Sequence, residues 1–168
     1  YLDAIDRGCK MIYVDPHAGP EPSKAAEWIP IKPATDLAFM LGMLYTALYE
    51  IKTIDEWSVK NRSNGPYLIG PDGNYVRDAA SKKPLMWDAV EKKARAFDEM
   101  PSMNAALEGT YDVNGVKASP AFQLIKDATK PYTPEWAEKM CTVPAATIRR
   151  LTKEFFDHAH IGSTITID

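Results

Sequence analysis

The sequence predicts an α/β fold in which helices cover a parallel sheet. Residues 11–14 are a short, continuous apolar run bounded by Gly8 and Pro16, which is typical of a buried parallel strand. An apolar helix is expected at about 35–50, and a strand of alternating β-branched residues at 163–167. Strands separated by helical segments are the pattern of an α/β domain.

Length and composition are those of a globular domain with a sizeable core. The chain has 168 residues, of which 45% are hydrophobic and 26% charged, with a formal net charge of −3. Because basic and acidic residues are interleaved, no basic stripe favours nucleic acid. No apolar run approaches the roughly 18 residues that a membrane span requires.

The two ends are expected to continue in a longer protein. The first residues have no start methionine and none of the basic and apolar regions of a signal peptide. The chain also stops within an expected strand. The compartment stays open, with a prokaryotic periplasm or cytoplasm as the alternatives.

Residues 1–60 are expected to form the α/β part of the chain. Leu2 and Ile5 have helical spacing, and Gly8 then favours the end of that helix. Pro30 interrupts a second apolar stretch at 28–31 and excludes an ordinary central strand, since proline has no amide donor. The helix that follows has no charge between Asp36 and Glu50, so we expect it to be buried on most faces.

Residues 61–119 are expected to be an inserted, hairpin-rich segment. Before it, the sequence TIDE at 53–56 is a capping box that opens a short helix. Within it, Asp72-Gly73 and Asn114-Gly115 are typical hairpin turns. The stretch 87–99 allows either a helix or a hairpin, and propensity alone slightly favours the helix.

Residues 120–168 are expected to be helices that lead back to a sheet strand. One helix should cover 121–129, and the sequence TPE at 133–135 supplies the N-cap, first-turn proline and first-turn acid of another. A third helix is expected at about 144–158. Its inner face should consist of Ile148, Leu151, Phe155 and Phe156.

Catalytic signatures are scarce in this sequence. There is no P-loop, GxSxG, HExxH or GxGxxG motif. Cys9 and Cys141 are expected to be two buried thiols, although a disulfide between them stays open. His158 and His160 are two positions apart at a helix end, where favourable charge at the C-terminus is the expected role.

A ligand site is predicted at the carboxyl end of the first strand. Asp15 follows that strand, and an acid in this place of a nucleotide-binding sheet bonds ribose hydroxyls. The helix start near Thr35 and Asp36 offers free amides and a carboxylate to a phosphate or a purine edge. The residues equally allow Asp15 to be a loop-capping acid and Asp36 to be a plain N-terminal charge.

Two stretches resemble the molybdopterin oxidoreductases of the dimethyl sulfoxide reductase family. The first is KMIYVDP at 10–16 with AAEWIPIKPATDLAFMLGM at 25–43, and the second is YTPEWAE at 132–138 with VPAATIRR at 143–150. The sequences LEGTY at 107–111 and PAFQL at 120–124 resemble a subset of these enzymes with an inserted β-rich segment.

The resemblance implies a Rossmann-like domain that holds the guanosine end of a bis-(molybdopterin guanine dinucleotide) cofactor carrying molybdenum or tungsten. Residues 1–60 would then be its nucleotide-binding part. The cofactor contacts would come from two loops, formed by Asp15, Pro16 and His17 and by Ala34, Thr35 and Asp36.

Two of these positions depart from the family pattern. His17 stands where arginine is usual, and it keeps a hydrogen-bond donor but is not a fixed cation. Ala34 stands where glycine is usual, so its backbone is expected to tolerate a Cβ. The resemblance also implies that 87–97 is a hairpin.

The resemblance places the reaction outside this chain. It implies that the 4Fe–4S cluster and the metal ligand belong to regions before Tyr1, and a second pterin-binding region to residues after Asp168. No catalytic residue or metal ligand is therefore expected here, and the isolated chain is expected to be inactive. The expected partners are an iron–sulfur electron-transfer subunit, together with the rest of the catalytic polypeptide to which the chain itself belongs. The alternative is a stand-alone nucleotide-binding or protein-interaction module with no metal role.

Overall fold

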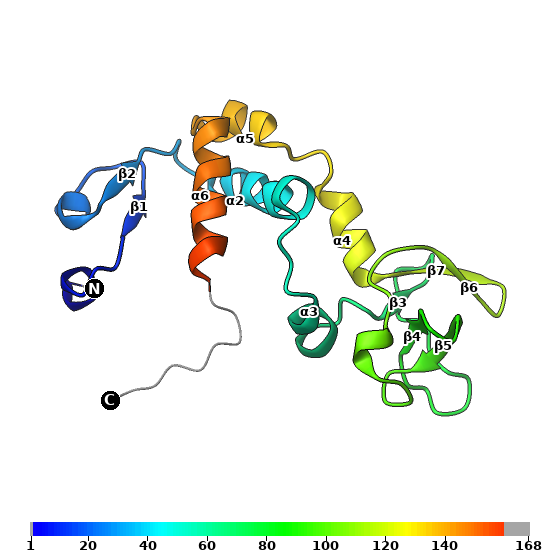
Figure 1. Cartoon of the computed structure of the whole chain (residues 1–168). Helices are drawn as coiled ribbons and strands as arrows, with labels where there is room; N and C mark the ends of the chain where they lie inside the picture. Colours follow the sequence, from blue (N-terminus) through cyan, green and yellow to red (C-terminus); the bar gives the residue numbers. More distant parts are fainter. Residues whose placement is uncertain (1, 160–168) are drawn as a thin grey trace. The chain divides into compact units, whose positions relative to one another are not determined.

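The computed structural model describes residues 2–159, except for the side chains of Glu21 and Pro22. The chain forms two compact units (Figure 1). Of the described residues, 2–52 and 130–159 form unit 1 and 53–129 form unit 2. The strand expected at 163–167 lies outside the described residues, and the division at residues 60 and 119 stays a prediction.

Unit 1 combines a pair of short strands with helices. Its elements are α1 (Leu2–Asp6), β1 (Ile12–Val14), the 3₁₀ turn η1 (Glu21–Lys24), β2 (Glu27–Ile29), α2 (Asp36–Tyr45), the π-helical turn η2 (Thr46–Ile51), α5 (Pro134–Cys141) and α6 (Ala145–His158).

The parallel sheet of unit 1 is smaller than the sequence led us to expect. β1 and β2 pair in parallel, with Ile12 opposite Glu27 and Val14 opposite Ile29. Within residues 2–159 no further strand joins them. The expected α/β fold is therefore confirmed as a mixed fold with small sheets, and the Rossmann-like parallel sheet is not clearly shown. β2 ends at Ile29 because Pro30 has no amide to donate to a partner.

The core of unit 1 lies where α2, α5 and α6 meet. Its buried members are Ile29, Ile31, Ala38, Phe39, Ala137, Cys141, Val143, Ile148 and Leu151. The approach of α2 to α5 is close because Gly42 has no side chain, and a Cβ there would lie 2.7 Å from the Cβ of Ala137. This core fixes the helices against which the parallel pair packs.

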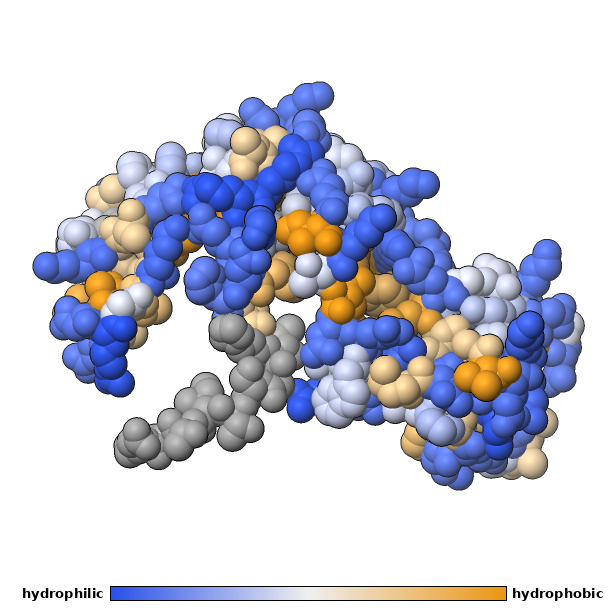
Figure 2. All heavy atoms as spheres, viewed as in Figure 1, coloured by the Kyte–Doolittle hydropathy of each residue, from blue (hydrophilic) through white to orange (hydrophobic). Residues whose placement is uncertain are grey.

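α2 is not buried on most faces, contrary to the expectation from its apolar sequence. Leu37 is 72% exposed and Met40 57% exposed, because α2 packs mainly on one side, against α5 and α6. Figure 2 shows strongly apolar residues at several places on the otherwise polar surface. The helix also changes to π geometry at Thr46 and ends at Lys52, whose φ is +55°.

The C-terminal helices follow the sequence prediction closely. The Thr133 hydroxyl accepts a hydrogen bond from the amide of Trp136 and caps α5, as expected. Ile148 and Leu151 of α6 are buried, but Phe155 is 60% exposed, so the expected inner face is wrong at that position. The expectation of two buried thiols holds only in part: both cysteines are free, with Cys141 buried and Cys9 exposed.

Unit 2 is rich in hairpins, as its turn signals predicted. Its elements are α3 (Glu56–Arg62), β3 (Leu68–Ile69), β4 (Leu85–Asp88), β5 (Lys93–Ala96), the 3₁₀ turn η3 (Ser102–Asn104), β6 (Tyr111–Val113), β7 (Val116–Pro120) and α4 (Ala121–Thr129). β3, β7 and β6 form one antiparallel sheet, and β4 and β5 form a hairpin.

In unit 2, the sequence allowed either a helix or a hairpin in the stretch 87–99. The stretch 87–99 contains a hairpin turn, in which the buried Asp88 carboxylate accepts hydrogen bonds from the amides of Val90 and Glu91. These bonds hold the pKa of Asp88 below its ordinary value.

The cap of α3 is Asp55, whose side chain accepts a hydrogen bond from the amide of Ser58. The predicted start of the capping box at Thr53 is therefore wrong.

Candidate functional site

The candidate site lies at the carboxyl edge of the β1–β2 pair. β1 and β2 are parallel and in register. The polypeptide therefore leaves the sheet at the same edge after each strand, once after Val14 and once after Ile29. The amide of Asp15 donates to the carbonyl of Ile29, which extends the pairing by one residue. Ligands of α/β sheets lie outside this edge.

The first loop is a tight turn organised by the carboxylate of Asp15. Its Oδ1 accepts a hydrogen bond of 2.8 Å from the amide of His17, so Asp15 does cap its loop. The indole Nε1 of Trp28 donates to the main-chain oxygen of Asp15 over 2.9 Å and ties the loop to β2. No donor among the described residues reaches Oδ2. His17 and Pro16 are exposed.

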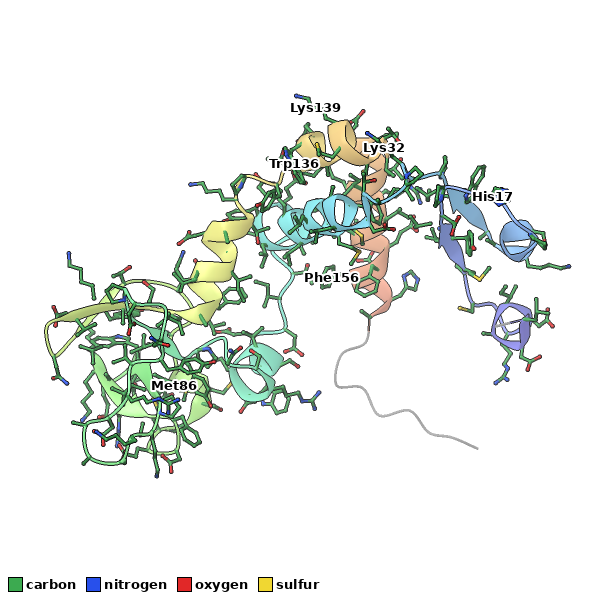
Figure 3. The ribbon with its side chains drawn as sticks, turned by 180° about the vertical axis from the view of Figure 1, so that it is seen from behind. His17, Lys32, Met86, Trp136, Lys139 and Phe156 are labelled. Carbon is green, nitrogen blue, oxygen red and sulfur yellow. The ribbon has the colours of Figure 1, made fainter. Side chains whose placement is uncertain are left out.

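The second loop connects β2 to α2. The amide of Lys32 donates to the carbonyl of Cys141 at 3.0 Å, which anchors the loop to the end of α5. Ala34 has a φ of +62°, the left-handed region that favours glycine. The turn into α2 requires this positive φ, and a residue with a Cβ can adopt it only at a cost in energy that glycine avoids. Figure 3 labels His17 and Lys32, one from each loop.

The start of α2 has no side-chain cap. Thr35 occupies the N-cap position, but its hydroxyl donates to the carbonyl of Lys32 at 2.6 Å and does not accept from the helix amides. The first amides of a helix have no partner within it, so they remain available to an acceptor outside it. Asp36 is the first helical residue and is exposed. The loop and the helix start thus present donors and a carboxylate side by side.

A charge network holds the parallel pair against α6. Arg150 bonds both Glu27 of β2 and Glu154, and Glu154 also bonds Lys10, which precedes β1. The bonds from Lys10 and Arg150 hold the pKa of Glu154 below its ordinary value. Glu27 and Glu154 raise the pKa of Arg150. The network positions the strand pair without touching the carboxyl edge.

The structure thus assembles the two predicted loops on adjacent strand ends. It also adds residues that sequence reasoning missed, namely Trp28, Lys32 and the Arg150 network. The first two lie within the recognised motif, but nothing local signals the pairing of Arg150 with Glu27, 123 positions away. Within residues 2–159, no group of three or more His, Cys, Asp or Glu side chains gathers as metal ligands would, and no helix could cross a membrane.

Comparison with known proteins gives several relatives. A sulfite dehydrogenase subunit from Allochromatium vinosum is 32% identical over 162 residues, covering 88% of this chain and 17% of that protein. The molybdopterin-containing subunit of the arsenate respiratory reductase from Shewanella sp. is 27% identical, covering 90% of this chain and 14% of the relative. The chain thus spans less than a fifth of the length of these relatives. No family model matches it.

The fold is similar to that of a solved structure. The acetylene hydratase from Pelobacter acetylenicus has a TM-score of 0.52 over 99% of this chain and 15% of its own, at 18% identity. This likeness concerns the fold alone. Relatives named as subunits of dimethyl sulfoxide, perchlorate and selenate reductases confirm the resemblance drawn from the motifs. The chain belongs to the molybdopterin oxidoreductase catalytic subunits.

Proposed function

We propose that this chain is the part of a larger molybdenum or tungsten oxidoreductase that holds the guanosine end of a molybdopterin guanine dinucleotide. The observation that carries the proposal is that Asp15 and the loop leading to the uncapped start of α2 both follow the carboxyl edge of the parallel pair. Membership of the oxidoreductase family supports the choice of ligand. The cofactor supplies the redox chemistry of such an enzyme, and this chain supplies binding and orientation.

The chemistry of the residues present fits a guanosine. Guanine offers two adjacent N–H donors on its pairing edge, which the exposed Asp36 carboxylate can accept. The Oδ2 atom of Asp15 suits a ribose hydroxyl, because its Oδ1 is already held by the amide of His17. The free amides at the start of α2 suit a phosphate oxygen. His17 lies on the same loop as Asp15 and can donate a further hydrogen bond.

The remaining expectations concern the whole enzyme. An iron–sulfur cluster and the metal ligand would be supplied by other regions of the catalytic polypeptide, and electrons would be exchanged with an iron–sulfur partner protein. The relatives support the presence of partner subunits, because each is named as one subunit, A or alpha, of its enzyme.

The test is an Asp36→Ala substitution in the full-length enzyme. We expect guanine released by acid hydrolysis, and metal content, to fall by roughly tenfold, since a lost charge-assisted hydrogen bond costs about 1.5–3 kcal/mol. Asp6→Ala, at an exposed acid in α1, is the control and should keep full occupancy. Unchanged guanine content in Asp36→Ala would remove Asp36 from the site, and a full-length protein that binds no pterin would overturn the proposed function.

A further inference from the structure

Trp28 is a large aromatic side chain that lies outside the core of unit 1. It is the middle residue of β2, and 40% of it is exposed. Side chains alternate along a strand, so Trp28 lies on the face of β2 opposite to that of Glu27 and Ile29. Glu27 bonds Arg150 of α6, and Ile29 is buried in the core. Core packing therefore does not account for an indole on the other face.

The indole completes a set of bonds that fix the main chain of Asp15. Its Nε1 donates to the main-chain oxygen of Asp15 over 2.9 Å. The amide of Asp15 donates to the carbonyl of Ile29 over 3.2 Å. Both peptide groups that flank the Cα of Asp15 are thus bound to β2, one by the main chain of the strand and the other by the side chain of Trp28.

The direction of the Asp15 carboxylate follows from these bonds. Its Oδ1 accepts from the amide of His17 over 2.8 Å, so the carboxylate is held by the same short turn and Oδ2 is left for a ligand. Without the indole bond, the peptide group that joins Asp15 to Pro16 would lose its anchor on β2, and the turn could change direction. A binding group that is already held in its productive geometry costs less entropy when the ligand binds.

We propose that Trp28 is a positioning residue of the nucleotide site, which acts through Asp15 and not by touching the ligand. The inference rests on the proposed function, because it assigns to Trp28 the placing of the carboxylate that takes the ribose. The indole has a single polar group, its N–H, and that group bonds the main chain of the ligand loop. Water could satisfy the N–H of an exposed indole, so the consequence of this bond is a fixed loop.

The test is Trp28→Phe in the full-length enzyme, which keeps an aromatic ring and removes the N–H donor. We expect guanine retained after dialysis, measured by acid hydrolysis, to fall about fivefold, the effect of losing one neutral hydrogen bond. Trp57→Phe, at an exposed tryptophan of α3 in unit 2, is the matched control and should retain guanine fully. Unchanged guanine in Trp28→Phe would overturn the inference.

A double variant separates positioning from direct contact with the ligand. If Trp28 acts only through the Asp15 carboxylate, Trp28→Phe should lower guanine content no further in a protein that already carries Asp15→Ala. Independent losses that multiply would place the indole on the ligand and contradict the positioning role. Loss of guanine in Asp15→Ala with none in Trp28→Phe would refute this inference alone. Full guanine in both Asp15→Ala and Asp36→Ala would overturn the proposed function itself.

Amide hydrogen exchange in the 168-residue chain gives a readout that needs no ligand. We expect the amide of His17, which bonds the Asp15 carboxylate, to exchange about fivefold faster in Trp28→Phe. The amide of Lys32, which bonds the carbonyl of Cys141 in the second loop, should keep its rate. Faster exchange of both amides would indicate a general loss of stability and would overturn the positioning role, as would an unchanged rate at His17.

Discussion

At the scale of single residues, the backbone of Ala34 marks a strained position in the candidate site. A non-glycine residue in the left-handed region costs about 1–2 kcal/mol, and the φ of Ala34 is +62°. Such strain persists where surrounding bonds fix the chain, here through Lys32 and Thr35. The amino-acid type alone did not reveal it, because φ is set by how the loop joins β2 to α2.

Ala34→Gly is therefore expected to stabilise the chain by about 1 kcal/mol. The free energy of unfolding in urea measures the effect. Ala146→Gly is the control, because it lies on the exposed side of α6, where the same change should cost about 1 kcal/mol. A lower stability for Ala34→Gly would show that the Cβ makes a favourable contact at this turn.

At the scale of elements, the contact between α2 and α5 depends on the missing side chain of Gly42. Gly42→Ala in a helix ordinarily gains about 1 kcal/mol, but overpacking against Ala137 costs about 1–3 kcal/mol. We expect a net loss of stability, measured as a lower midpoint of urea unfolding. Adding Ala137→Gly should recover part of it, and strict additivity of the two changes would contradict the close contact.

The network around Glu154 predicts how the packing of β1 and β2 on α6 depends on pH. The folded-state pKa of Glu154 lies below its ordinary value, chiefly because Lys10 bonds the carboxylate and then because Arg150 does. Its contribution to stability is therefore fully present above the ordinary pKa of 4.5 and is lost as the pH falls through the lower folded value.

Glu154→Gln should accordingly lower the free energy of unfolding at about pH 7, and the difference from the unsubstituted chain should shrink as the pH is lowered from about 5 to about 3. Urea unfolding at several pH values measures it. Glu99→Gln, at an exposed position of unit 2, should differ little from the unsubstituted chain throughout. A difference that is constant with pH would mean that the ion pairs contribute nothing to the fold.

At the scale of the whole molecule, the two units have separate cores among the described residues, with one buried cluster in unit 1 and two in unit 2. Ile148 is fully buried in unit 1 and Leu68 in unit 2. Ile148→Ala and Leu68→Ala should each cost about 2–5 kcal/mol within their own unit. We expect amide exchange to accelerate mainly in the unit that carries the substitution. Equal acceleration in both units would show that they unfold as one cooperative structure.

The sequence by itself determined the local elements of this protein and its family. Patterns within a few residues predicted the cap at Thr133, the turn at Asn114-Gly115 and the first strand. Capping, turn preference and a short apolar run are all local features of a sequence. The two motif stretches identified the family over most of the chain, and the relatives confirm it.

Only the tertiary structure decided which surfaces are covered and how the site is held. The ion pair of Glu27 with Arg150 and the bond from Lys32 to Cys141 join residues that are far apart in sequence. The exposure of Leu37 depends on which neighbouring elements cover α2. An apolar helix has the same sequence whether one face or all faces are covered. Burial and long-range bonds are properties of the packed molecule, because they arise only when separate elements meet.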